Sequence, residues 1–137
     1  MLHSKYRRLF VSTLLLLSFF AFGFAGDKAN AKWAKFSEQL VKAVKSPNTG
    51  VRASAIQHMI RYYDSLDVYA ARYDLMDLFL KSDNPGMRRL SLVAMHKINS
   101  RFDMGYLQLH YPYEKDNSIK SQIAAVLHDT GRYVPRH

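Results

Sequence analysis

The chain has 137 residues, carries 20 Lys and Arg against 11 Asp and Glu, and contains no cysteine. This length fits one domain together with a targeting segment. Without cysteine the chain has no disulfide framework, no iron–sulfur cluster, no thiolate zinc site and no cysteine nucleophile.

The first 31 residues have the layout of a secretory signal peptide. Three basic residues within the first eight positions precede an uncharged apolar run, Leu9–Ala25, and the short polar stretch Gly26–Ala31 follows. We expect cleavage after Ala31. The alternatives are cleavage after Ala25 or retention of the apolar run as an uncleaved membrane anchor. Cleavage after Ala31 leaves a mature domain of residues 32–137 with a formal net charge of +6.

The composition of the mature domain favours a bacterial envelope protein, periplasmic or secreted. Exported eukaryotic domains are commonly stabilised by disulfides and modified at Asn-x-Ser/Thr sites. The chain has neither cysteine nor such a site.

After residue 31, apolar residues recur at every third or fourth position, which predicts a succession of amphipathic helices. The predicted helices are Lys32–Lys45, a second capped by Asn48 or Thr49 and reaching Tyr63, a third capped by Ser65 or Asp67 and reaching Phe79, Pro85–Ile98, and Ser118–Thr130. The segment Asp103–Tyr111 fits either a short helix capped by Asp103 or a strand. Since no two segments pair convincingly as a sheet, the predicted fold class is all-α.

The sequence contains an internal repeat. Ser46–Arg52 and Ser82–Arg88 lie 36 residues apart and share Ser, Asn, Gly and Arg in the same register. A weaker third copy follows after a further 32 residues, with Asp116, Ile119 and Lys120 in the corresponding positions. Periods of this length indicate stacked helix pairs, and therefore a small α-solenoid.

The segments Val51-Arg52-Ala-Ser-Ala55 and Met87-Arg88-Arg-Leu-Ser91, each preceded by a turn that contains Asn, resemble HEAT repeats. The resemblance covers about residues 46–131. It implies a short right-handed α-solenoid of about two and a half helix pairs, in which the hydrophobic–Arg pair opens the first helix of each repeat. The helix at 32–45 would then cover one end of the stack, and the third copy, which has no second helix, would cover the other.

The HEAT resemblance also implies a structural role for three cations. In that family the Arg commonly bonds to an acid or amide of a neighbouring repeat, so that successive repeats form a ladder. The ladder positions in this chain would be Arg52, Arg88 and Lys120.

No arrangement of residues indicates catalysis, a metal or a cofactor. The histidines of the mature chain lack the His-x3-His spacing of a metal site, and four of its five methionines occupy apolar positions that packing explains. Asp64, Asp67, Asp74 and Asp77 fit helix caps and ion pairs, and no nucleophile elbow or phosphate loop accompanies them. We therefore expect a protein that is not an enzyme.

One helix face carries residue types that are common in protein interfaces. Tyr69, Arg72, Tyr73 and Met76 share a face of the predicted third helix, and Tyr106 and His110 extend it if Asp103–Tyr111 is helical. Tyr and Arg supply broad contact area with a polar tip. We interpret these six residues as partner-binding; the alternative is that they pack between repeats.

The sequence thus predicts a non-catalytic interaction module or adaptor that binds another envelope protein. The alternative is a basic peripheral protein held by charge on an anionic lipid or polysaccharide surface, since the sequence pI is about 9.9. Nucleic acid is not an expected partner of an exported protein.

Overall fold

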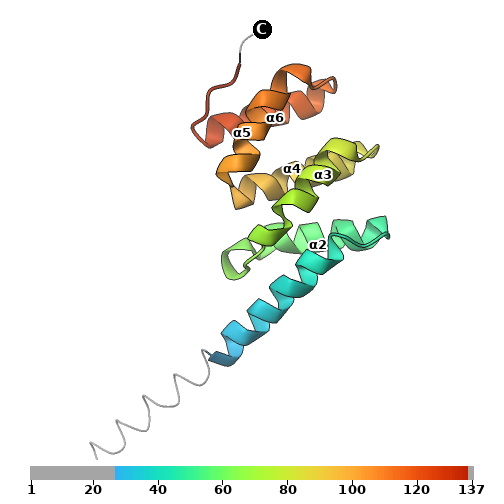
Figure 1. The fold of residues 1–137 in the computed structure, drawn as a ribbon, viewed down its shortest axis with the longest axis vertical. Helices are drawn as coiled ribbons and strands as arrows, with labels where there is room; N and C mark the ends of the chain where they lie inside the picture. Colours follow the sequence, from blue (N-terminus) through green and yellow to red (C-terminus); the bar gives the residue numbers. More distant parts are fainter. Residues whose placement is uncertain (1–26, 136–137) are drawn as a thin grey trace, which may run out of the picture. The chain divides into compact units, whose positions relative to one another are not determined.

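The computed structural model describes residues 27–135, which belong to two compact units. Unit 1 comprises residues 1–35, and its described part, residues 27–35, is helical. Unit 2 comprises residues 36–137 and contains the other helices (Figure 1). Within the described range every regular element is helical, so the all-α class is confirmed.

The helices of unit 2 follow one another with short links. Residues 36–43 are helical. After them come α2 (Thr49–Arg61), the 3₁₀ turns η1 (Tyr63–Ser65) and η2 (Tyr69–Ala71), α3 (Arg72–Lys81), α4 (Pro85–Ile98), α5 (Arg101–His110), the 3₁₀ turn η3 (Tyr111–Tyr113) and α6 (Asn117–Asp129).

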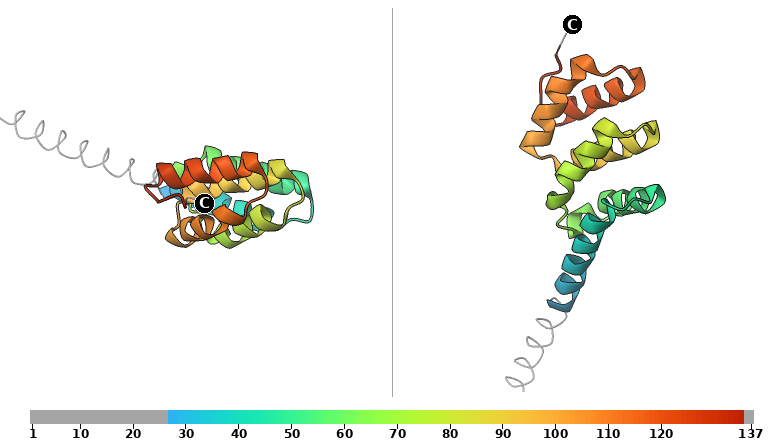
Figure 2. Two further views of the ribbon diagram at one scale, coloured as in Figure 1. Left: turned by 90° about the horizontal axis from the view of Figure 1, so that it is seen from above. Right: turned by 45° about the vertical axis from the view of Figure 1, so that its right-hand side comes forward.

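These helices pack as three helical hairpins. Residues 36–43 pair with α2, α3 pairs with α4, and α5 pairs with α6. The second helices of successive hairpins also contact one another, because α4 packs against both α2 and α6. Figure 2 shows the three hairpins of unit 2 as successive layers.

The sequence predicted that each repeated segment opens the first helix of a pair, and the structure corrects this prediction. The hydrophobic–Arg pair opens α2 and α4, and the corresponding Ile119-Lys120 opens α6. Each of these helices is the second of its hairpin rather than the first. The third copy therefore has a partner helix, α5, which precedes it. Apolar periodicity identifies the buried face of a helix but not the neighbour that buries it.

The repeated turn is the same hydrogen-bonded structure in all three hairpins. Asn48 Oδ1 accepts the N–H groups of Gly50 and Val51 at 2.8 and 3.2 Å, and so caps α2. The same pattern recurs in the other hairpins at the same spacing: Asn84 caps α4 and Asp116 caps α6. These oxygens satisfy amide groups that a helix N-terminus leaves unpaired.

A second acceptor completes each turn two residues earlier. Ser46 Oγ accepts the N–H of Asn48 at 3.2 Å, and Ser82 Oγ accepts the N–H of Asn84 at 3.2 Å. In the third copy Glu114 takes the place of the serine, and its Oε1 accepts the N–H of Asp116 at 2.9 Å. The shared Ser and Asn are therefore residues whose side chains accept from the turn, and the shared Gly50 and Gly86 donate their N–H to that Asn.

The structure settles one open segment of the sequence prediction and moves the boundaries of two predicted helices. The segment at 103–111 is helical, and Ser100 rather than Asp103 caps it, since Ser100 Oγ accepts the N–H of Asp103 at 3.0 Å. Helix α3 begins at Arg72, because η2 takes up the residues before it. Helix α6 ends at Asp129, close to Gly131, whose φ of 70° is the left-handed conformation that glycine favours.

The predicted signal segment lies largely outside the described residues, which begin at 27. Among the described residues, no helix is both long enough and apolar enough to cross a bilayer.

The caps make the repeated turn testable. Replacing Asn84 with Ala removes the acceptor for two amide groups and should lower the free energy of unfolding by about 1 kcal/mol. The matched control is Asn117→Ala, because Asn117 is exposed and lies inside the first turn of α6. Thermal unfolding of both variants checks this, and equal losses would contradict a specific role for the turn.

Candidate functional site

The three repeated cations share one role inside their own hairpins. The guanidinium of Arg52 donates to the carbonyl of Ser46 at 2.8 Å, and Nε of Arg88 donates to the carbonyl of Phe79 at 2.8 Å. Lys120 Nζ donates to the carbonyl of Pro112 at 3.4 Å. Each cation therefore reaches back toward the end of the preceding helix, where unpaired carbonyls and the helix dipole favour positive charge.

Of the three, Arg88 also bonds to the next hairpin. Its two terminal nitrogens donate to Glu114 Oε1 and Oε2 at 3.3 and 2.5 Å. Only 18% of the Arg88 side chain and 3% of the Glu114 side chain are exposed. This bidentate ion pair ties α4 to the turn before α6. Arg52 bonds to Ser46, Pro47 and Thr49, and Lys120 bonds to Pro112, all within their own hairpins.

The surroundings of Glu114 keep it ionised. Burial opposes the charge, but hydrogen bonds from Arg88, from the N–H of Asp116 and from His110 outweigh it and lower the pKa of Glu114 to about 2. His110 Nε2 lies 3.1 Å from Glu114 Oε2. The ring of His110 is also fixed by Phe79, whose ring meets it edge-on, and by Tyr106, which stacks on it.

A surface cluster of a different kind lies on η2, α3 and α5. The guanidinium of Arg72 sits between two tyrosine rings, 4.2 Å from the centroid of Tyr69 and 4.1 Å from that of Tyr73. The ring of Phe102 meets Tyr73 at 5.9 Å between centroids. The three aromatic side chains are 51%, 55% and 57% exposed. We call Tyr69, Arg72, Tyr73 and Phe102 the aromatic patch.

The structure brings together half of the residues that the sequence grouped as partner-binding. Tyr69, Arg72 and Tyr73 form the aromatic patch, whereas Met76 is buried in the core. Tyr106 and His110 are half-buried and stack beside Glu114. Phe102 was missed, because no periodicity reveals that the first turn of α5 comes next to α3.

Asp103 is the other unusual group near this surface. Its side chain is fully buried. Burial raises the pKa of Asp103, although the Ser100 hydroxyl and the positive charge of Arg72 lower it in part. Because burial of a carboxylate is costly, the ionised form of Asp103 opposes folding at neutral pH.

Within the described residues, no three His, Asp or Glu side chains are grouped so that they could hold a metal ion. Comparison of the chain with protein-family models, with curated proteins and with solved structures finds no match. The HEAT resemblance therefore rests on the residues of this chain alone.

The ion pair predicts the effect of removing Arg88. Arg88→Ala leaves Glu114 buried and unpaired and should cost about 1–3 kcal/mol at neutral pH. Arg89→Ala, at the exposed neighbouring position, should cost almost nothing.

The same pair has a pH signature. The pKa of Glu114 falls from 4.5 to about 2 on folding. The ionised carboxylate therefore stabilises the folded protein fully above pH 4.5, and this contribution is lost as the pH falls through about 2. The difference in melting temperature between wild type and Arg88→Ala should therefore narrow across this window. A difference that is constant from pH 6 to pH 2.5 would contradict the assignment.

The ionisation of Asp103 should affect the stability of the protein in the opposite direction to that of Glu114. The pKa of Asp103 is raised in the folded protein, so folding is penalised once the pH exceeds the ordinary value of 3.8. Asp103→Asn should raise the melting temperature by about 2–5 °C at pH 7, and the gain should vanish near pH 3.5. The exposed Asp83→Asn serves as the control. An unchanged melting temperature at pH 7 would show that the carboxyl of Asp103 is not desolvated.

Proposed function

We propose that this chain is an exported, non-catalytic HEAT-like repeat protein that binds another envelope protein through the aromatic patch. The observation that carries this proposal is the exposed stack of Tyr69, Arg72 and Tyr73, joined by Phe102. In this proposal the three hairpins form a short right-handed α-solenoid, and export follows from the signal-like segment 1–31.

The arrangement of the patch suits recognition. Nη1 of Arg72 donates to the carbonyl of Tyr69 at 3.1 Å, and the rings on both sides further restrict its guanidinium. Side chains that are ordered before binding lose less conformational entropy when a partner docks. Aromatic and Arg side chains are also the commonest energetic anchors of protein interfaces.

The fold supplies a rigid base for such a surface. Helix α3 packs along α4. Its residues Leu75, Met76 and Phe79 are buried and fix the helix in place. Arg88 holds the carbonyl of Phe79 at the end of this helix. The patch therefore stands on an element that is held by both apolar packing and a charged hydrogen bond.

The test is the double variant Tyr69→Ala, Tyr73→Ala, compared with Tyr113→Ala, Tyr133→Ala. The control removes two tyrosines that are 78% and 64% exposed outside the patch. Crosslinking in intact cells should show loss of the partner with the patch variant only, at an unchanged melting temperature. A large fall in melting temperature would show that the patch tyrosines serve packing.

Ionic strength distinguishes this proposal from simple adsorption on an anionic surface. An aromatic-anchored contact should weaken little between about 0.05 and 0.3 M salt, whereas charge-driven adsorption weakens steeply over that range. Loss of association in high salt, with no effect of the patch variant, would favour the basic peripheral protein.

A further inference from the structure

The cation of the aromatic patch has no carboxylate partner within the described residues 27–135. Arg72 is half-buried, and its one hydrogen bond in that range runs to the carbonyl of Tyr69 at 3.1 Å. No Asp or Glu oxygen of the same range lies within ion-pair distance of its guanidinium. By contrast Arg88, which is also half-buried, holds Glu114 through two N–H groups. Because a guanidinium has five N–H donors, Arg72 keeps most of its donors for a partner.

The acids on the same helix as Arg72 are paired with other cations. Asp74 lies 3.6 Å from the ammonium group of Lys45, and Asp77 forms an ion pair with Lys81. These carboxylates therefore leave Arg72 free to pair with an acid of another molecule.

Asp103 is a buried acid whose charge interacts with that of Arg72. The positive charge of Arg72 lowers the pKa of Asp103 in part, but burial raises the same pKa by more. Burial thus disfavours the ionised form of Asp103 that would neutralise Arg72. A strong counter-ion for Arg72 has to come from outside the described chain.

The two tyrosine rings decide how a ligand can reach Arg72. The guanidinium carbon lies over both rings, 4.2 Å from the centroid of Tyr69 and 4.1 Å from that of Tyr73, so the rings cover its sides. A ligand therefore meets the guanidinium along its edge, where the N–H groups form a fork that matches the two oxygens of a carboxylate. Apolar groups of the ligand that rest on the exposed rings would exclude water from this pair and strengthen it.

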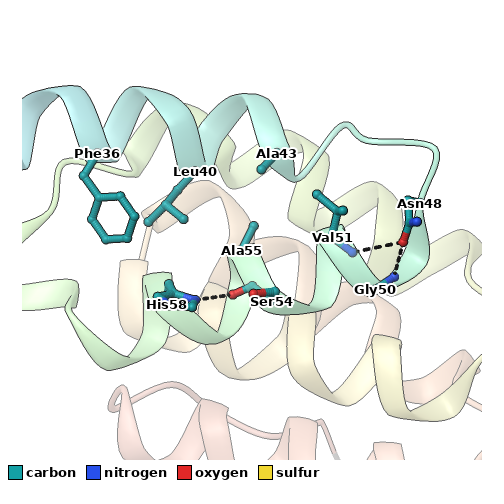
Figure 3. Close-up of a pocket in the computed structure, with 9 residues that line it drawn as sticks. All are labelled: Phe36, Leu40, Ala43, Asn48, Gly50, Val51, Ser54, Ala55 and His58. Carbon is teal, nitrogen blue, oxygen red and sulfur yellow. Dashed lines mark hydrogen bonds between the residues drawn. The ribbon is translucent and has the colours of Figure 1, made fainter.

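The apolar groove of the first hairpin has a different chemistry (Figure 3). It lies between residues 36–43 and α2, has a volume of about 490 Å³, and contains no Asp, Glu, Lys or Arg among its nine lining residues. Its lining does not select a partner by charge. The aromatic patch combines exposed rings with a cation, and so it does.

We propose that the aromatic patch recognises an acidic peptide segment of its partner, in which one Asp or Glu carboxylate pairs with Arg72. Apolar neighbours of that acid lie on Tyr69, Tyr73 and Phe102. The inference rests on the proposed function, because it names the chemistry of the segment that docks on the patch. Its basis is charge complementarity at a cation that the chain orders but does not pair.

The charges around the patch favour a single carboxylate over an extended anionic surface. Residues 62–81, which include both 3₁₀ turns before α3 and α3 itself, contain four acids and two cations. A lipid surface or an acidic polysaccharide would bring many negative charges against these acids, and like charges repel. The ring of Phe102 is also inclined at 69° to that of Tyr73, so the two rings share no plane on which a sugar could stack.

The test is selection of a random heptapeptide phage library on the immobilised full chain. Enriched peptides should carry one Asp or Glu next to aliphatic or aromatic residues. A synthetic copy of the most enriched peptide should bind about 10- to 100-fold more weakly once its acid is replaced with the corresponding amide, because one charged hydrogen-bonded pair is lost. This comparison requires no change in the protein.

Variants of the protein locate the pair. Arg72→Gln should weaken binding of the acidic peptide by the same factor and should leave binding of the amide peptide unchanged, so that the two losses do not add. Arg72→Lys keeps the charge without the fork and should fall between wild type and Arg72→Gln. The matched control is Arg89→Gln, which removes one exposed cation outside the patch and should keep the wild-type affinity. Melting temperatures measured alongside identify any loss that comes from unfolding.

The outcomes separate this inference from the proposed function. Peptides that lose affinity for Tyr69→Ala, Tyr73→Ala but bind Arg72→Gln as tightly as wild type would overturn the carboxylate and leave the patch as a binding surface. An equal loss in Arg89→Gln would reduce the effect to net charge and overturn the inference. So would the absence of acidic peptides from the selection, with phosphatidylglycerol vesicles bound through Arg72 instead. Peptides that bind the double tyrosine variant as tightly as wild type would contradict the proposed function as well.

Discussion

The pair formed by Arg88 and Glu114 is a buried ion pair that joins the second hairpin to the third. Arg88 bonds to the carbonyl of Phe79 at the end of α3, projects from α4, and holds the carboxylate that precedes α6. Glu114 in turn accepts from His110 and from the turn that caps α6. Because these groups are buried, each of them depends on the others for its hydrogen bonds, and the helices are fixed accordingly.

Apolar spacing was sufficient to predict the all-α class and the position of most helices. The repeat was visible because the residues that bond to the turn, such as Asn48 and Asn84, are kept in register. The pairing of the helices was predicted wrongly, because each repeated segment opens the second helix of its hairpin and not the first. A short link and an amphipathic pattern do not distinguish the helix before a turn from the helix after it, and that choice depends on packing over the whole of each helix.

The candidate site was predictable only where one short stretch of sequence carries it. Tyr69 and Tyr73 are four residues apart and flank Arg72, so the local sequence was enough to group them. Phe102 joins them from α5, and the burial of Met76 depends on how α3 meets α4, so neither follows from local sequence. The acid that pairs with Arg88 was also out of reach, because it lies 26 residues away in a position that another copy fills with serine.

That substitution of Glu114 for a serine gives the three hairpins the same geometry but different chemistry. The first two turns are closed by neutral hydroxyls, which respond to neither acid nor ionic strength. The third is closed by a carboxylate that also holds the hairpin in place. Acid that protonates Glu114 therefore loosens the junction between α4 and the third hairpin, whereas the hydroxyls that close the first two turns carry no charge to lose.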